Sequence, residues 1–124
     1  MAAPNIVNVA TITGKTAYAT PANTNATVLL ANSVSSNKVF KINSLVASNV
    51  DGTAAADVTV AVNTNAAGSG TSYPLASTVS VPADASLIIV DKTTAIYVGE
   101  TQSIVVTVGT SNAIELTASY EALT

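Results

Sequence analysis

The side chains of this sequence with most capacity for chemistry are its seven carboxylates, because the 124-residue chain contains no cysteine and no histidine. Asp51 and Asp57 flank the glycine Gly52, an arrangement found in some calcium loops. A calcium site needs further oxygen ligands at alternate positions and a bidentate glutamate. This segment supplies neither, so we interpret it as a turn with a solvated aspartate on each side.

Asp84 and Asp91 are the next pair to consider, since two carboxylates about 5 to 10 Å apart can hydrolyse a glycosidic bond. They lie at opposite ends of a predicted strand at residues 86–90. An extended chain rises about 3.3 Å per residue, which separates them by more than about 20 Å. They are therefore not a catalytic pair, and Asp84, which follows Pro82, fits a turn.

The three glutamates are expected to have structural roles. Glu100 follows Gly99 at what we predict to be a tight corner of a β-sandwich, where Tyr97 makes a hydrogen bond to the backbone. Glu115 and Glu121 fall on the polar side of the last predicted strand. We expect them either to keep that strand soluble or to protect it as a sheet edge.

The basic residues are four lysines, namely Lys15, Lys38, Lys41 and Lys92, and there is no arginine. This is too little positive charge for a stripe that binds a phosphate backbone, so we expect no nucleic-acid partner. Lys38 is predicted at an exposed strand end. Lys41 lies within a predicted strand and indicates an exposed edge strand or, as the less favoured alternative, a contact with an acidic neighbour.

No further motif in the sequence indicates catalysis. Zinc sites, thiolate nucleophiles and Ser-His-Asp triads all need residues that are absent. The glycosylation sequon at Asn25 has no secretory signal before it. We therefore expect no catalytic, cofactor-binding or metal-binding residue and no enzymatic activity, and a Ser-Lys or carboxylate hydrolase remains a formal alternative without support from spacing.

Alternation of apolar and polar residues predicts the fold. It is clearest at residues 58–62, 104–108 and 114–121. Further β-rich segments are residues 5–13, 26–31, 38–48, 75–81, 86–91 and 96–98, separated by turn signals at 13–15, 21–23, 32–37, 51–52, 68–70, 82–84, 91–92 and 99–100. The pattern predicts an all-β, single-domain antiparallel β-sandwich over residues 1–124, jelly-roll or immunoglobulin-like, with about eight or nine strands and an N-terminal arm at residues 1–5.

The composition predicts an unusual surface and core. Only 9% of residues are charged and 4% aromatic, although 48% are hydrophobic. The core must come from Val, Ile, Leu and Ala, with Phe40 and a few tyrosines as larger pieces, and within 38–48 we expect Phe40, Ile42, Ser44 and Val46 to share a face. Residues 63–72 are predicted to be a flexible loop. Hydroxyl ladders, formed by Thr11, Thr13, Thr107, Thr117 and Ser119, indicate a flat hydrogen-bonding face or ordinary β surface.

Three parts of the chain carry a family resemblance. They are APNIVNV and TGKT within residues 3–16, KVFKINSL and NVDG within residues 38–52, and VPADASL, DK and YVGE within residues 81–100. Together they resemble small virion structural proteins of tailed bacteriophages, particularly phages of marine cyanobacteria. The resemblance implies a β-sandwich that stabilises the particle as a capsid decoration (cement) protein. The alternative is a neck, tail or fibre accessory protein, including a host-surface or glycan-binding module.

The same resemblance implies the partners and the location. The partners would be the major capsid protein or neck and tail proteins, together with further copies of this chain, for which a trimer is one closed form without exposed edges. No apolar run approaches the ~20 residues of a membrane helix, so no membrane contact is expected. The protein would be made in the host cytoplasm and reside in the virion. For glycan binding, Tyr73 and Pro74 beside the 63–72 loop are the best candidates.

Overall fold

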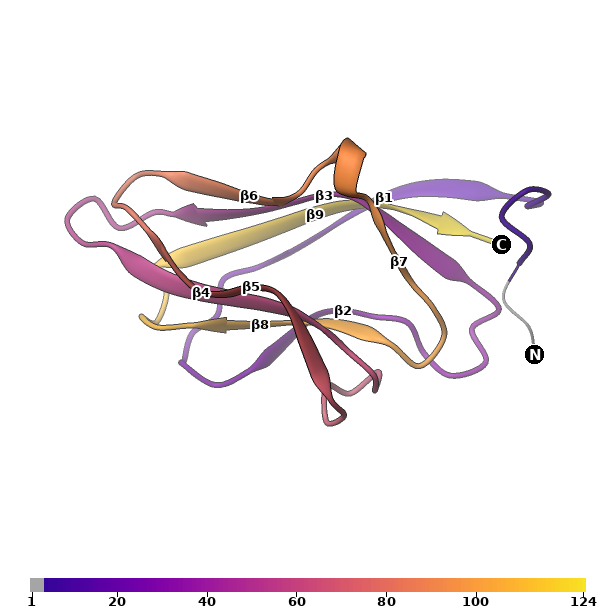
Figure 1. Cartoon of the computed structure of the whole chain (residues 1–124), viewed down its shortest axis with the longest axis horizontal. Helices are drawn as coiled ribbons and strands as arrows, with labels where there is room; N and C mark the ends of the chain where they lie inside the picture. The colour runs from indigo at the N-terminus through magenta and orange to yellow at the C-terminus, as the bar shows by residue number, and fades with distance from the viewer. Residues whose placement is uncertain (1–3) are drawn as a thin grey trace.

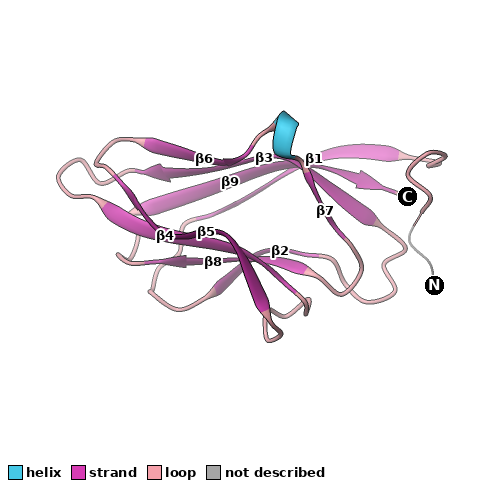
Figure 2. Ribbon diagram, in the orientation of Figure 1, coloured by secondary structure: helices cyan, strands magenta, loops and turns pink. Residues whose placement is uncertain are grey.

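The computed structural model describes residues 4–124 and consists of two antiparallel sheets packed face to face (Figure 1, Figure 2). Sheet A has five strands in the order β1-β9-β3-β6, with β7 also paired to β3, and sheet B has the order β2-β8-β4-β5. The strands are β1 (Ile12–Ala19), β2 (Thr27–Ala31), β3 (Val39–Asn49), β4 (Ala56–Asn63), β5 (Ser72–Val81), β6 (Ser86–Val90), β7 (Ile96–Val98), β8 (Ser103–Val108) and β9 (Ile114–Leu123). A 3-10 turn, η1 (Lys92–Thr94), precedes β7. The predicted antiparallel β-sandwich is confirmed.

The N-terminal strand departs most from the prediction. We expected a strand at residues 5–13 and a turn at 13–15, but β1 runs through Gly14 and Lys15 to Ala19. Most of β1 is exposed on both faces, so its residues do not alternate between apolar and polar. The sequence pattern that predicts a strand is therefore missing. Its eight residues are held instead by continuous pairing with β9. Of the predicted arm, residues 1–3 lie outside the described residues, and residues 4–5 are irregular chain.

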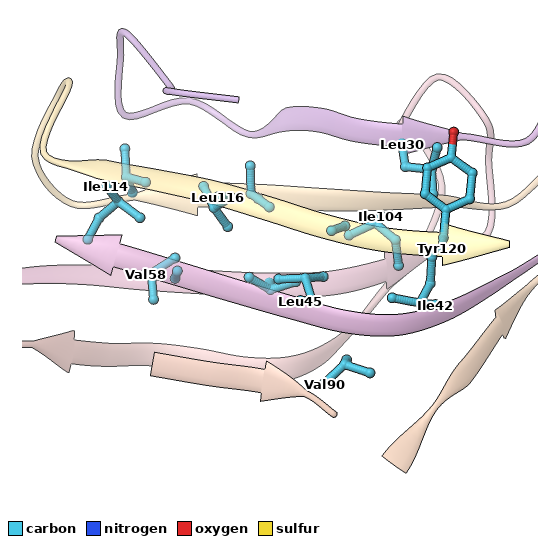
Figure 3. Close-up of a cluster of buried hydrophobic side chains, with 14 of the residues drawn as sticks. Leu30, Ile42, Leu45, Val58, Val90, Ile104, Ile114, Leu116 and Tyr120 are labelled. Atoms are coloured by element: carbon cyan, nitrogen blue, oxygen red, sulfur yellow. The ribbon is translucent and has the colours of Figure 1, made fainter. Parts of the chain in front are cut away.

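The core lies between the sheets and is aliphatic, as predicted. Ile42, Leu45, Ile104, Ile114 and Leu116 are fully buried, and Figure 3 shows them converging from both sheets. The two buried aromatic residues among those described are Phe40 and Tyr120, with ring centroids 5.1 Å apart. Branched aliphatic side chains fill a pleated surface well, so little aromatic area is needed.

A register shift in β3 reverses the expected faces of half of this strand. Phe40 and Ile42 point into the core, but the pairing with β9 slips between Ile42 and Ser44. Asn43 is therefore an extra residue, and after it Leu45 and Ala47 are buried instead of Ser44 and Val46. The prediction that all four even-numbered residues share a face is wrong because a one-residue shift exchanges the two faces of a strand.

The loop between β4 and β5, predicted to be flexible, packs over the outer side of sheet B. The side-chain oxygen of Asn63 accepts hydrogen bonds from the backbone N–H groups of Asn65 and Gly70. Gly68 adopts a left-handed φ of 80° and lies directly on Val28 and Val105. Val105 is consequently buried although it points away from the core.

Replacing Gly68 by alanine should destabilise the fold by about 1–2 kcal/mol, from the left-handed backbone alone. A Cβ atom there would also lie 3.0 Å from Val28 Cγ2 and 3.3 Å from Val105 Cγ2. The matched control is Gly14→Ala, because a Cβ at Gly14 meets no atom within 4 Å and alanine suits a strand better than glycine. Denaturant unfolding should move the two variants in opposite directions, and equal effects would contradict the packed loop.

Candidate binding surface

The outward side of sheet A, here called the outer A face, carries a row of side chains that crosses four strands. Thr117 of β9 pairs with Tyr18 of β1 on one side and with Val46 of β3 on the other, and Val46 pairs with Ile88 of β6. Residues directly opposite one another in antiparallel strands point to the same face. The two ends of the row are open to solvent, since Tyr18 is 79% and Ile88 is 64% exposed.

Small hydroxyl side chains flank this row. On one side, Ser119 pairs with Thr16 and with Ser44. On the other side, Ser48 and Ser86 face each other with their Oγ atoms 3.0 Å apart. Of the five residues predicted to form hydroxyl ladders, only Thr117 and Ser119 lie on the outer A face. The other predicted members lie elsewhere: Thr11 precedes β1, Thr13 points to the inward side of β1, and Thr107 is in sheet B.

Among the paired strand residues of the outer A face, the charged ones lie near the ends of the strands and not in the central row. Lys41 pairs with Glu121 on one side and with Tyr97 on the other, and Glu115 pairs with Ser48 at the opposite end. We favoured the interpretation that Lys41 lies on an exposed edge strand. This is wrong, because β3 has a neighbouring strand on both sides. The alternative, an acidic neighbour, agrees with the strand pairing, which places Glu121 opposite Lys41. Glu115 and Glu121 point outward as predicted. They protect no edge, however, because β9 lies between β1 and β3.

Asp51, Asp84 and Asp91 are found in turns, as predicted, whereas Asp57 is an exposed residue of β4. The side chain of Asp51 accepts hydrogen bonds from the backbone N–H and the hydroxyl of Thr53. Asp84 follows Pro82 with a left-handed φ of 58°, and Asp91 caps η1 at the other end of β6. Among residues 4–124, no three potential metal-ligating side chains of the His, Cys, Asp and Glu types cluster together, and no pocket is present.

The chain turns before β8 at the predicted position, but the side chains at this corner do not make the predicted contacts. The backbone N–H of Gln102 donates to the carbonyl of Gly99, and Glu100 accepts a hydrogen bond from the backbone N–H of Asn37. Tyr97 makes no hydrogen bond to the backbone of residues 4–124, contrary to the prediction, because its position in β7 turns the side chain outward beside Lys41. Lys38 is half-buried rather than exposed, and its carbonyl accepts a hydrogen bond from Asn32.

Three buried asparagines were missed by the sequence analysis. Asn32 directly follows β2, while Asn49 and Asn63 end β3 and β4. In each, the side-chain nitrogen donates two hydrogen bonds. Asn32 donates to the carbonyls of Lys38 and Val98, and Asn49 donates to the carbonyls of Ala54 and Val81. Asn63 donates to the Gly70 carbonyl and to the Ser72 hydroxyl. They fix the loops at the ends of the sheets. The available signal was an asparagine at the junction of an apolar strand and a turn-rich segment.

The pKa values of two turn aspartates are lowered by hydrogen bonds. Thr93 and Thr94 donate to Asp91, and Thr53 donates to Asp51, so both pKa values lie below the ordinary value of 3.8. Burial raises the pKa of Tyr120 above its ordinary value of 10.0. The carboxylates therefore contribute stability above about pH 4 that is lost at lower pH, whereas the tyrosine contributes stability that is lost as the pH rises above about 10.

Asp91→Asn should reduce the acid sensitivity of the fold. Asparagine can still accept the capping hydrogen bonds, but it does not titrate. Between about pH 4 and pH 2, the free energy of unfolding should therefore fall less steeply in the variant than in the unmodified chain. Urea unfolding at several pH values measures this slope, and an unchanged slope would show that Asp91 has no part in it.

No family model and no curated protein matches this chain. Among the described residues, no helix has the length and hydrophobicity needed to cross a bilayer. The glycan candidates Tyr73 and Pro74 are exposed on β5, in the sheet opposite the outer A face.

Proposed function

We propose that this chain is a non-enzymatic structural protein of a tailed-phage virion, and that the outer A face binds it to the particle. The proposal rests on the row formed by Tyr18, Thr117, Val46 and Ile88, in which Val46 is half-buried and the other three side chains are exposed. Burying uncharged side chains avoids the large cost of desolvating ions. The cores of protein interfaces are likewise depleted of charged residues, with aromatic residues enriched.

The binding partner proposed first is the major capsid protein, with the chain acting as a decoration protein. The row and its hydroxyl neighbours extend over four adjacent strands of one sheet, which suits an open shell surface better than a narrow cleft. The resemblance to phage virion proteins supplies the class of partner. Virion residence and synthesis in the host cytoplasm are parts of the same proposal.

The neck, tail or fibre alternative has its own observation, which is the 63% exposed side chain of Tyr73. An exposed aromatic ring beside polar groups is the usual platform for a sugar. In this alternative, a glycan array would identify ligands whose binding is lost in Tyr73→Ala. Under the decoration proposal, the array gives no ligand and Tyr73→Ala binds particles normally.

The experiment that tests the proposed function is co-sedimentation of the purified chain with phage capsids lacking their small virion proteins. Saturable binding, with a fixed number of copies per particle, is the expected result. Ser77→Asp is a suitable control variant, because Ser77 is exposed in β5 of sheet B, away from the outer A face. Absence of binding, or binding confined to isolated tails, would contradict the decoration proposal.

A further inference from the structure

Strand β1 presents a row of backbone hydrogen-bonding groups that no strand of the described residues pairs with. Thr11 and Thr124 exchange both backbone hydrogen bonds, with N···O distances of 3.1 and 3.0 Å. Hydrogen-bonded and non-hydrogen-bonded pairs alternate along an antiparallel ladder. Every second residue after Thr11 therefore bonds to β9, whereas Ile12, Gly14, Thr16 and Tyr18 direct their backbone N–H and C=O groups to the unpaired side.

The other sheet edges in the described residues are irregular or short. The pairing of β2 shifts between Val28 and Leu30, and β6 has an extra residue between Ile88 and Val90. Strand β5 contains Pro74 and two register shifts, while β7 is only three residues long. Such features prevent an edge from pairing with another chain. In β1, the pairing is continuous over eight residues, and the protecting feature is the single charge of Lys15.

We infer that β1 pairs antiparallel with β1 of a second copy of this chain, around a two-fold axis at Thr16. The charge of Lys15 selects this register. An axis at Lys15 would place two lysines directly opposite each other, with Cα atoms about 4.5 Å apart, which is destabilising. An axis at Gly14 or Ala17 pairs only residues 12–16 or 15–19 of each copy.

The axis at Thr16 pairs residues 13–19 of both copies and separates the two Lys15 side chains, so they no longer repel each other directly. Lys15 then lies opposite Ala17 of the second copy, and Tyr18 lies opposite Gly14. An aromatic residue across from a strand glycine covers the backbone that the glycine leaves exposed. The backbone N–H and C=O groups of Gly14, Thr16 and Tyr18 on the unpaired side of β1 then form hydrogen bonds with the second copy. The outer A faces of the two copies become one continuous surface. This pairing uses the edge of sheet A and does not depend on the proposed function.

Cysteine cross-linking tests the inference directly, because the chain has no native cysteine. Across the proposed axis, the two Thr16 Cα atoms form a hydrogen-bonded pair about 5.5 Å apart. This distance is within the usual range for a disulfide. Thr16→Cys should therefore oxidise to a covalent dimer at least tenfold faster than Gly14→Cys, whose two copies lie about 13 Å apart along the strands.

Two further measurements calibrate the cross-linking. Ser69→Cys, in the exposed β4–β5 loop, gives the rate of random collision. A mixture of Gly14→Cys and Thr16→Cys reports the competing register with the lysines in place, because Gly14 lies opposite Thr16 when the axis is at Lys15. A rate for Thr16→Cys equal to that of Ser69→Cys, or below that of the mixed cross-link, would overturn the inference. The cross-linking test and the particle-binding test are independent of each other. When Ile88→Asp is combined with Thr16→Cys, particle binding should be lost while the cross-link still forms.

The native mass provides a second measurement. The unmodified chain should reach the mass of two copies in sedimentation at high concentration. Thr16→Pro should stay at the mass of one, because it removes an N–H that points away from β9 and proline is tolerated at such edge positions. Circular dichroism confirms that this variant is folded. A single-copy mass for the unmodified chain at several hundred micromolar would contradict the inference.

Discussion

Asn49→Ala should lower the free energy of unfolding by about 2–4 kcal/mol, a large part of the 5–15 kcal/mol typical of a domain. The side chain of Asn49 is 2% exposed and donates to the carbonyls of Ala54 and Val81, while its oxygen accepts from the backbone N–H of Asp51. Alanine leaves these groups without their partner, and each buried unpaired polar group costs about 1–3 kcal/mol. Denaturant unfolding measures the loss.

The control variant is Asn43→Ala, because Asn43 is the extra residue of β3 and its side chain makes no hydrogen bond with the described residues. It should change stability by less than about 1 kcal/mol. Asn49→Asp separates hydrogen bonding from packing, since it keeps the shape but replaces the donor by an oxygen. Burial should raise the pKa of this introduced carboxyl, so the variant should lose stability as the pH rises from about 4 to 7. Equal stability of the two alanine variants would contradict the role assigned to Asn49.

Ile88→Asp should weaken binding to capsids by about 100-fold or more. Ile88 ends the exposed row of the outer A face, next to Val46. The substitution removes apolar contact area and places a charge where the interface must exclude water, and a 100-fold loss corresponds to about 2.7 kcal/mol. Titration of particles with labelled protein measures the affinity.

Stability provides the necessary control for this binding variant. Because Ile88 is 64% exposed, Ile88→Asp should unfold within about 0.5 kcal/mol of the unmodified chain. Ser77→Asp introduces the same charge in sheet B and should leave binding unchanged. Similar affinities for the two variants would mean that the outer A face is not the binding surface.

The sequence was sufficient for the elements that have one buried and one exposed face. In β9, the buried residues Ile114, Leu116, Ala118 and Tyr120 alternate with outward ones, so the strand and its inward face were both predicted correctly. In β8, the inward residues Ile104, Val106 and Val108 were also predicted correctly, although Val105 on the other face is buried by the β4–β5 loop. Burial on one side imposes a period of two residues on the sequence, and this period is visible without a structure.

Features that depend on pairing between distant segments were not predictable in this way. Strand β1 forms because β9 is beside it, and the register shift after Ile42 reassigns the faces of β3. The row on the outer A face needs the registers of four strands, so its members are scattered from residue 18 to residue 117. Serines, threonines and isolated apolar residues carry no signal of their own until the sheet brings them together.

The most direct test of the proposed function is a reconstruction of capsids decorated with this chain, at a resolution that orients the sandwich. We expect the density on the capsid surface, with Tyr18, Val46 and Ile88 of the outer A face buried against the major capsid protein. Density that turns this face to solvent, or that contacts the capsid only through sheet B or its loops, would contradict the account.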